Sequence, residues 1–297
     1  VLVRVTHAVI CGSDLHVLYE MPVEEYPFPA GFSGHECVGV VEESRSPVFQ
    51  RGERVLVIPP QANAWVEYIV VEPGWLIPIP DHVPMEQAVL AQLLGCVIYT
   101  CKKLDNVLGK RVVVVGQGPA GILFSSLLRL MGARQIIGLD IVDQRLETAA
   151  QMGADHTINN NRDDPVEAVK ELTQGQLADI VIEAVGKEET INLCPDLAHE
   201  FGELVLFGGP KSRTITFDFE KFLRKQLQTT SSAHTQQEAG LVSFRLAMDF
   251  IGRGRMDVAP LISHRFQFTD LQYAFDLAYS RQNGALKVLV NIGSGAE

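Results

Sequence analysis

Three residues near the start of the chain carry side chains that bind transition metals. Cys11 opens the segment Cys11-Gly-Ser-Asp-Leu-His, and His35 and Glu36 follow in Gly-His-Glu. A catalytic zinc takes three protein ligands of the N, S or O type and leaves one position open to substrate or water. The residue types therefore indicate a zinc site. A buried cysteine and a histidine satisfied in a core would give the same residues, so the spacing alone leaves both interpretations open.

A glycine-rich motif, G-x-G-x-x-G, lies between a β-branched apolar run at 112–116 and a helix-like stretch at 119–132. In such a motif Gly116 permits the tight turn, Gly118 lets the backbone approach a pyrophosphate, and Gly121 lets the helix pack closely on the strand. The helix N-terminus supplies free N–H groups and partial positive charge to the phosphates. The motif, which predicts a dinucleotide site, consists of Gly116, Gln117, Gly118, Pro119, Ala120 and Gly121.

Asp140 ends the next predicted strand, 19 residues after Gly121. A carboxylate there would accept a hydrogen bond from the ribose 2′-OH and repel a 2′-phosphate, which favours NAD over NADP. Arg145 lies close by and could touch a 2′-phosphate. The alternative is a glycine-rich turn in another α/β fold, with Asp140 merely capping the next helix.

The two parts of the chain differ in the length and spacing of their apolar runs. Residues 1 to about 90 are short apolar runs broken by Gly and Pro, which predicts short strands in a mostly antiparallel, barrel-like arrangement. From about residue 96, apolar strands alternate with helices, as in a doubly wound α/β domain. In this second part we predict strands at 112–116, 136–140, 179–186 and 203–209, and helices at 119–132, at 143–152 and before the last strand. Towards the end of the chain we predict a helix at 238–252, polar loops, a helix at 269–280 and a strand at 285–292.

Composition excludes several classes of protein. The net charge of −11 would repel the phosphate backbone, which argues against nucleic-acid binding. No apolar run approaches the roughly 20 residues that span a bilayer, and the first residues do not resemble a signal peptide. The five cysteines form no C-x-x-C pair, which suits a reducing compartment. We therefore expect a cytoplasmic protein that acts on a small molecule.

In combination, these segments resemble the zinc-dependent medium-chain dehydrogenases, the superfamily of alcohol, polyol and threonine dehydrogenases. C-G-S-D-x-H, then G-H-E, then G-x-G-x-x-G occur in the family's order, and further matching segments (IEAVG, LFGGP, ALKVLV) extend over nearly the whole chain. The resemblance implies a Rossmann domain and a GroES-like, mostly antiparallel catalytic domain. We place the Rossmann domain at 97–232 and the catalytic domain at 1–96 and 233–297.

The resemblance also implies roles for individual residues. The zinc ligands would be Cys11, His35 and Glu36, with Glu36 a direct or alternating ligand. Asp14 would orient a metal-bound imidazole, Ser13 would hydrogen-bond the substrate hydroxyl, and His16 would carry the released proton towards solvent. Val185 would join the glycine-rich motif, Asp140 and Arg145 in the cofactor site.

Three departures from the family pattern stand out. Many members carry a lobe with four cysteines that bind a structural zinc, but no cysteine lies between Cys37 and Cys96 here. We therefore expect one catalytic zinc and no structural zinc. Family members usually begin further upstream, so we expect the N-terminal part to be trimmed. Gln92 stands where the polyol branch has a glutamate near the metal, and we interpret Cys96 as a packing residue in the inter-domain helix.

We thus expect a zinc-dependent oxidoreductase (EC 1.1.1.-) that transfers a hydride between NAD and a secondary alcohol, polyol or hydroxy-amino acid. One alternative is a zinc-free reductase like the quinone and enone reductases, and another is a dinucleotide-binding protein without turnover. The family is usually dimeric or tetrameric, so we expect a homodimer or homotetramer. Neither the substrate nor the number of subunits follows from the sequence.

Overall fold

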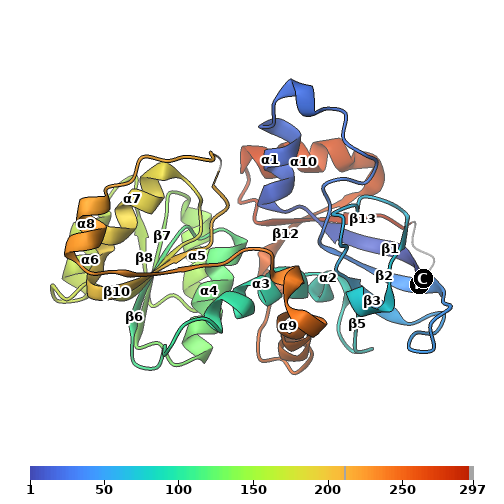
Figure 1. The fold of residues 1–297 in the computed structure, drawn as a ribbon, viewed down its shortest axis with the longest axis horizontal. Coiled ribbons are helices and arrows are strands. Elements are labelled where there is room, and N and C mark those ends of the chain that lie inside the picture. Colours follow the sequence, from blue (N-terminus) through green and yellow to red (C-terminus); the bar gives the residue numbers. More distant parts are fainter. Residues whose placement is uncertain (211, 294–297) are drawn as a thin grey trace. The chain divides into compact units, whose positions relative to one another are not determined.

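The computed structural model describes residues 1–210 and 212–293, which form two compact units (Figure 1). One unit joins Val1–Cys96 to the segment that begins at His234. The other unit is the continuous segment Val97–Ala233. The chain therefore leaves the first unit, builds the second one, and returns.

The first unit is built on a mostly antiparallel sheet. Its strand order is β12-β13-β1-β2-β3-β5, and β4 pairs with β1. The only parallel pair in this sheet, among the described residues, is β12 with β13. The strands are β1 (Leu2–Val9), β2 (Cys37–Glu43), β3 (Arg54–Val57), β4 (Tyr68–Val70), β5 (Leu76–Pro78), β12 (Ile262–Gln267) and β13 (Lys287–Asn291).

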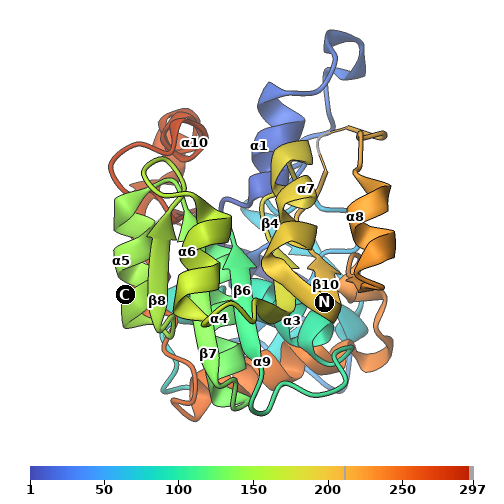
Figure 2. The ribbon, with the colours of Figure 1, turned by 90° about the vertical axis from the view of Figure 1, so that its left-hand side faces the viewer.

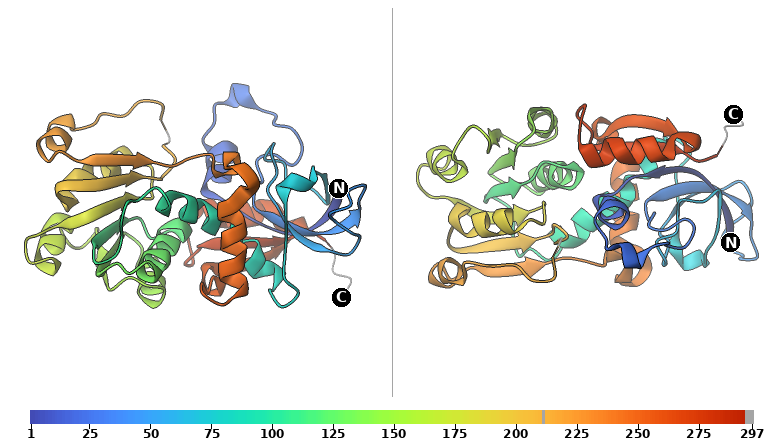
Figure 3. Two further views of the ribbon diagram at one scale, coloured as in Figure 1. Left: turned by 60° about the horizontal axis from the view of Figure 1, so that its bottom comes forward. Right: turned by 90° about the horizontal axis from the view of Figure 1, so that it is seen from above.

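Strands from the first and the last parts of the described chain pair in this sheet. In β1 and β13, His7 pairs with Asn291 and Val9 with Leu289. Figure 3 shows the blue and red segments side by side. Apolar side chains of these strands, Val3, Val5, Val288 and Val290 among them, form the core of the unit. The pairing of β1 with β13 thereby brings the first and the last strands of the described chain side by side.

Helices lie on and beside the sheet of the first unit. The segment C-G-S-D-L-H, for which the sequence had given us no secondary structure, begins a helix (α1) that packs against α10. The helices are α1 (Gly12–Tyr19), α2 (Met85–Ala88), α3 (Ala91–Cys101), whose last turns belong to the second unit, α9 (Val242–Gly252) and α10 (Leu271–Ser280).

The prediction of polar loops between residues 252 and 269 was wrong in part, because β12 occupies Ile262–Gln267. In this strand Ile262 is buried, while Arg265 and Gln267 are exposed. A strand with one face towards water carries polar residues at alternate positions, so its sequence resembles that of a loop. Its backbone is satisfied by parallel pairing with β13.

The second unit is a six-stranded parallel sheet with the order β11-β10-β9-β6-β7-β8 (Figure 2). Counted from β6, this is the order of a classic Rossmann fold, whose chain reverses direction across the sheet between β6 and β9. The predicted Rossmann fold is therefore correct. The strands are β6 (Arg111–Val115), β7 (Gln135–Asp140), β8 (His156–Asn159), β9 (Ala178–Glu183), β10 (Ala198–Leu206) and β11 (Gln228–Ser231).

Helices connect the parallel strands. Helix α4 begins at Pro119 and ends at Leu130, and Gly132, which has φ +88°, follows it. The N–H of Gly132 donates to the Arg129 carbonyl oxygen and that of Ala133 donates to the Leu128 carbonyl oxygen, which is a Schellman ending. The helices are α4 (Pro119–Leu130), α5 (Asp143–Gln151), α6 (Pro165–Leu172), α7 (Glu188–Leu197) and α8 (Phe219–Arg224). No helix in the described part of the chain is long and apolar enough to cross a bilayer.

Candidate metal and dinucleotide sites

The three predicted metal ligands lie together in the first unit. One ligand atom from each of Cys11, His35 and Glu36 lies within 4.8 Å of the others, and this is the one such group found among the described residues. Cys11 is the N-cap of α1, while His35 and Glu36 immediately precede β2. Ligands around a tetrahedral zinc lie about 3.5 Å apart, given bonds of about 2.0–2.3 Å. Small side-chain movements would therefore close this donor set around a zinc ion, and the residues fit the metal.

Asp14 holds two parts of this cluster in place. Its carboxylate is fully buried and accepts hydrogen bonds from the Cys11 backbone N–H (2.9 Å) and the Ser33 hydroxyl (2.7 Å). The Nδ1 atom of His35 lies 3.1 Å from the Ser33 carbonyl oxygen and 3.4 Å from Asp14 Oδ1. These acceptors favour a proton on Nδ1, which leaves Nε2 as the metal-binding nitrogen. This geometry supports the role expected for Asp14.

Glu36 has a partner that the sequence analysis did not identify. The ammonium of Lys287, in β13, donates to both Glu36 carboxylate oxygens at 2.7 Å and lies 3.4 Å from the Ile10 carbonyl oxygen. Lys287 is only 2% exposed and Glu36 only 1%. Burial lowers the pKa of Lys287, but Glu36, Cys11 and Asp14 raise it overall above the ordinary value, so the lysine stays charged.

Charge around the cluster is balanced when zinc is present. Cys11 as a thiolate, Glu36 and Asp14 supply three negative charges, and zinc and the Lys287 ammonium together supply three positive ones. For His35, burial lowers the pKa, but Cys11 and Asp14 raise it overall above its usual range. A metal ion would displace a proton to bind this imidazole.

Cys96, which the sequence analysis interpreted as a packing residue, lies near the metal cluster. Its thiol is close enough to Glu36, Cys11 and His35 for their charges to affect its pKa, which burial raises to about 12. In the absence of a metal ion the thiol is therefore protonated at neutral pH. Gln92 is 8% exposed and precedes Cys96 by one helical turn in α3, so the two residues share a helix face.

Ser13 and His16 both lie on α1, close in sequence to Cys11. Ser13 is exposed, and His16 Nδ1 lies 2.9 Å from the Glu20 carboxylate, with about a third of the His16 side chain exposed. A histidine that is partly exposed and paired with a carboxylate can exchange protons with solvent. The positions are compatible with the expected roles of both residues.

The glycine-rich turn of the second unit follows β6 at the carboxyl edge of the parallel sheet. Gly116 has φ +93°, in the region that favours glycine. A Cβ on Gly121 would lie 1.8 Å from the Gly116 carbonyl oxygen, whereas nothing lies within 4 Å of a Cβ on Gly118. Pro119 and Ala120 form the first turn of α4. The turn thus leaves open space at Gly118, in front of the helix N-terminus, where an anion could bind.

Asp140, at the end of β7, binds this turn. Its Oδ2 accepts from the Gln117 backbone N–H at 2.6 Å, and its Oδ1 accepts from Ile141 (2.7 Å) and Val142 (3.0 Å). A carboxylate has about four lone-pair sites, so one remains on Oδ2 for a ribose hydroxyl. Arg145 lies in the first turn of α5 and is partly buried.

Two buried polar side chains to which the sequence analysis gave no separate role hold the adjacent loops. Gln117 donates to the Val114 carbonyl oxygen (2.9 Å) and fills the space where a side chain on Gly138 would lie. Glu183, at the end of β9, accepts from the backbone N–H groups of Val185 and Gly186 at 2.9 Å each. An acidic residue that ends an apolar strand was the available signal for Glu183.

Val185 contacts the glycine-rich turn. A Cβ on Gly116 would lie 2.5 Å from Val185 Cγ2, so the two residues are in van der Waals contact range. The motif, Asp140 and Val185 therefore gather at the carboxyl ends of β6, β7 and β9, where the strand order reverses. Ligands of open α/β sheets bind at such a position.

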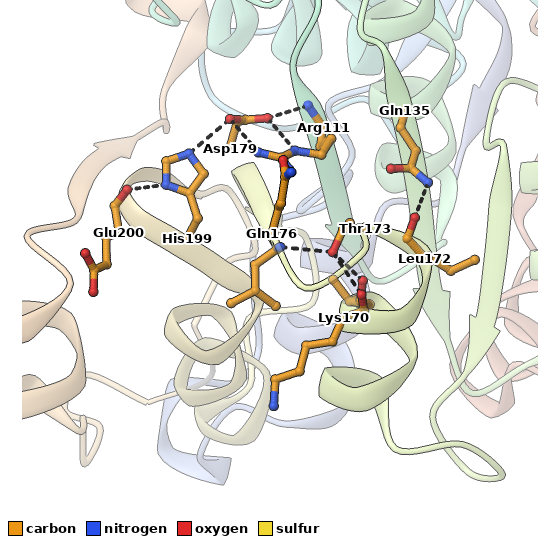
Figure 4. A network of polar contacts seen from close by, with 11 residues as sticks. Arg111, Gln135, Lys170, Leu172, Thr173, Gln176, Asp179, His199 and Glu200 are labelled. Carbon is orange, nitrogen blue, oxygen red and sulfur yellow. Dashed lines mark hydrogen bonds and ion pairs between the residues drawn. The ribbon is translucent and has the colours of Figure 1, made fainter.

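The opposite, amino-terminal edge of the sheet carries a structural network (Figure 4). Asp179 Oδ2 accepts from the Arg111 backbone N–H (2.7 Å) and Nε (3.1 Å), and Oδ1 lies 3.0 Å from His199 Nε2. Burial raises the pKa of Asp179, but Arg111 and His199 lower it overall to about 2. This network joins the starts of β6, β9 and β10.

Two family models match the chain. Residues 1–81 match the alcohol dehydrogenase GroES-like domain, and residues 119–251 match the zinc-binding dehydrogenase model. Together they cover most of the chain; the first match includes the metal cluster, and the second begins at Pro119, within the glycine-rich turn. The GroES-like fold expected for the first unit is thereby confirmed.

Individual proteins resemble the chain over nearly its whole length. An alcohol dehydrogenase from Cupriavidus necator is 29% identical over 97% of this chain and 91% of its own length. A sorbitol dehydrogenase from Bacillus subtilis is 25% identical over 98% of this chain and 89% of its own. The crystal structure of L-idonate 5-dehydrogenase from Escherichia coli superposes with a TM-score of 0.86 at 25% identity, covering 98% of this chain and 90% of the other.

Proposed function

The chain belongs to the zinc-binding medium-chain dehydrogenase family and is a zinc-type, NAD(P)-dependent dehydrogenase-like oxidoreductase (EC 1.1.1.-), and from this premise we propose the chemistry of its sites. We propose that it transfers a hydride between NAD and a secondary alcohol, polyol or hydroxy-amino acid, at one zinc held by Cys11, His35 and Glu36. The observation that carries this proposal is the convergence of these three side chains, from two separate sequence motifs, within 4.8 Å.

Zinc would act as a Lewis acid that lowers the pKa of the substrate hydroxyl. The remaining tasks belong to side chains of this protein. Asp14 and the Ser33 carbonyl oxygen fix the ring of His35, and Cys11 is fixed through its own backbone N–H. Ser13 would accept a hydrogen bond from the substrate hydroxyl and so orient the substrate. The released proton would pass to solvent through His16, which is paired with Glu20.

The cofactor would bind at the carboxyl edge of the parallel sheet. The open space at Gly118 and the start of α4 would accept the pyrophosphate, in reach of the Pro119 and Ala120 segment. The free lone pair of Asp140 would accept from the ribose 2′-OH, and Val185 would contact the cofactor beside the turn. A substrate alcohol then loses a hydride to NAD⁺ and a proton to solvent, which balances the reaction.

The names of the relatives indicate the general class of substrate. The relatives named above are, by their names, dehydrogenases of alcohol, sorbitol and L-idonate, all compounds that carry a hydroxyl group. We therefore propose a small alcohol or the corresponding carbonyl compound as substrate. On the basis of the family resemblance, we also propose an assembly of two or four identical chains. The acidic chain is proposed to act in the cytoplasm.

A substrate panel tests this function. Purified protein is mixed with secondary alcohols, polyols and hydroxy-amino acids in the presence of NAD or NADP, and cofactor reduction is followed by absorbance. An enone panel with the reduced cofactors tests the zinc-free reductase. Turnover of an alcohol supports the proposal, whereas turnover of enones alone would favour the reductase, and binding of NADH with no turnover on either panel would favour a binding protein.

A further inference from the structure

A buried lysine touches the candidate metal site but has no part in the mechanism above. Lys287 lies in the interior strand β13, and its ammonium is enclosed by the two Glu36 oxygens at 2.7 Å and the Ile10 carbonyl oxygen at 3.4 Å. A buried ammonium requires compensation of this kind, because removing it from water is costly. The side chain therefore has a specific electrostatic partner in Glu36.

The same carboxylate also belongs to the metal cluster. Glu36 Oε1 lies 4.0 Å from His35 Nε2, and a Glu36 oxygen is within 4.8 Å of the ligand atoms of His35 and Cys11. Each oxygen accepts one 2.7 Å hydrogen bond from Lys287 and keeps a second lone pair, so a metal ion bound by Glu36 would share the carboxylate with the ammonium. Two cations, the ammonium and the metal, thus compete for one carboxylate.

We propose that Lys287 is a positioning residue that restrains Glu36 from full coordination of the metal and so weakens zinc binding. The inference rests on the proposed zinc site. Two effects act in the same direction: the hydrogen bonds withdraw charge from the carboxylate, which makes it a poorer ligand, and the ammonium repels a second cation nearby. Glu36 would then serve as a ligand that binds and releases readily, while Cys11 and His35 hold the metal throughout.

Replacing Lys287 by Met separates this role from a merely structural one. Methionine keeps an unbranched chain of similar length and removes the charge. In metal-free protein the variant should unfold at a lower temperature, because Glu36 is left buried without a partner. Its affinity for zinc, measured by competition with a chelating dye, should rise on the order of tenfold. Zinc should consequently raise the unfolding temperature of the variant more than that of the wild type.

Three further variants complete the experiment. Lys287→Arg keeps the charge and should bind zinc about as the wild type does. The double variant Glu36→Gln with Lys287→Met replaces the unpaired carboxylate by a neutral amide, which costs less to bury. It should recover part of the metal-free stability while losing the tight zinc binding. Lys170→Met, at an exposed lysine of the second unit, should change neither property.

The outcomes show separately whether the inference about Lys287 and the proposed zinc-dependent function are correct. If the wild type binds zinc and Lys287→Met binds it equally or more weakly, Lys287 only stabilises the fold and the inference is wrong. If the wild type binds no zinc, the proposed function itself fails. Should Lys287→Met fold only with zinc, the variant is purified zinc-loaded and its rate of zinc loss to a chelator is compared with that of the wild type; slower loss supports the inference and faster loss overturns it.

Discussion

The carboxylate of Asp140, at the end of β7, accepts a 2.6 Å hydrogen bond from the backbone N–H of Gln117 in the glycine-rich turn. The residue proposed to select the cofactor therefore also holds the turn that would bind the cofactor's phosphates. Any substitution of Asp140 affects both tasks. A useful experiment must measure a quantity in which the effect on the turn cancels.

The ratio of affinities for NAD and NADP is such a quantity. Asp140→Asn keeps the size of the side chain and removes the charge that would repel a 2′-phosphate. Both affinities should fall as the turn loosens, but the preference for NAD should shrink by about 10- to 150-fold, which corresponds to one charge-assisted hydrogen bond of about 1.5–3 kcal/mol. Binding is measured by titration with the reduced cofactors. A wild type that binds NADP at least as well as NAD would refute the role of Asp140.

Substitution of two glycines of the same turn should have different effects, one on stability and the other on NADH binding. In Gly121→Ala the new Cβ would lie 1.8 Å from the Gly116 carbonyl oxygen, and backbone must move, so the free energy of unfolding should fall by about 3 kcal/mol. In Gly118→Ala nothing lies within 4 Å and φ is −68°, so stability should change by less than about 0.5 kcal/mol. NADH binding by the Gly118 variant should nevertheless weaken on the order of tenfold, because the methyl group occupies the pyrophosphate's space. Normal NADH binding by Gly118→Ala would place the phosphates elsewhere.

The Asp179 network should make part of the stability dependent on pH. The folded-state pKa is lowered to about 2, so the paired carboxylate stabilises the protein fully above the unfolded-state pKa of about 3.9 and progressively less as the pH falls towards 2. Asp179→Asn should cost about 2 kcal/mol at pH 7, and roughly half of that at pH 3. Urea denaturation at both values measures the difference. Asp105→Asn, at an exposed acidic residue, is the control; an equal cost for Asp179→Asn at both pH values would contradict the pairing.

A carboxylate at position 92 should strengthen the metal site. Gln92 is buried and lies one helical turn before Cys96. The charges of Glu36, Cys11 and His35 affect the pKa of the Cys96 thiol, so this face of the helix lies near the metal cluster. Gln92→Glu should place a further negative charge near the metal and slow zinc loss to a chelator on the order of tenfold. Gln50→Glu, on an exposed position of the first unit, should have no effect. Unchanged zinc loss in Gln92→Glu would mean that residue 92 lies too far from the metal to act on it.

Local patterns predicted much of the fold from sequence. The β-branched run before Gly116 is a strand buried on both faces, and the helix predicted at 119–132 is present as α4, with a Schellman ending at Gly132. Strand β12 could not be predicted in the same way, since its exposed face gives it the composition of a loop. The helix at Gly12–Tyr19 was missed because a glycine, a serine and an aspartate begin it.

The candidate metal site shows where sequence reasoning stops. Cys11, His35 and Glu36 were identified because their types suit zinc and their motifs are specific. Lys287 lies 251 residues from Glu36 in the chain, and no local pattern links them. A lysine among the apolar residues of the strand A-L-K-V-L-V was the one available signal, since a charged residue in an interior strand needs a buried partner.

The most direct test of the central claim is a zinc titration of activity on metal-free protein. Metal is removed with a chelator, zinc is added back in steps, and NAD reduction with the best alcohol of the panel is followed on the same sample as the metal content. We expect activity to vanish on removal and to return in proportion to zinc up to one ion per chain, and Cys11→Ser to recover neither zinc nor activity while Cys194→Ser, in the second unit, behaves as the wild type. Full alcohol turnover by wild-type protein after complete metal removal would contradict the account and favour a zinc-free reductase.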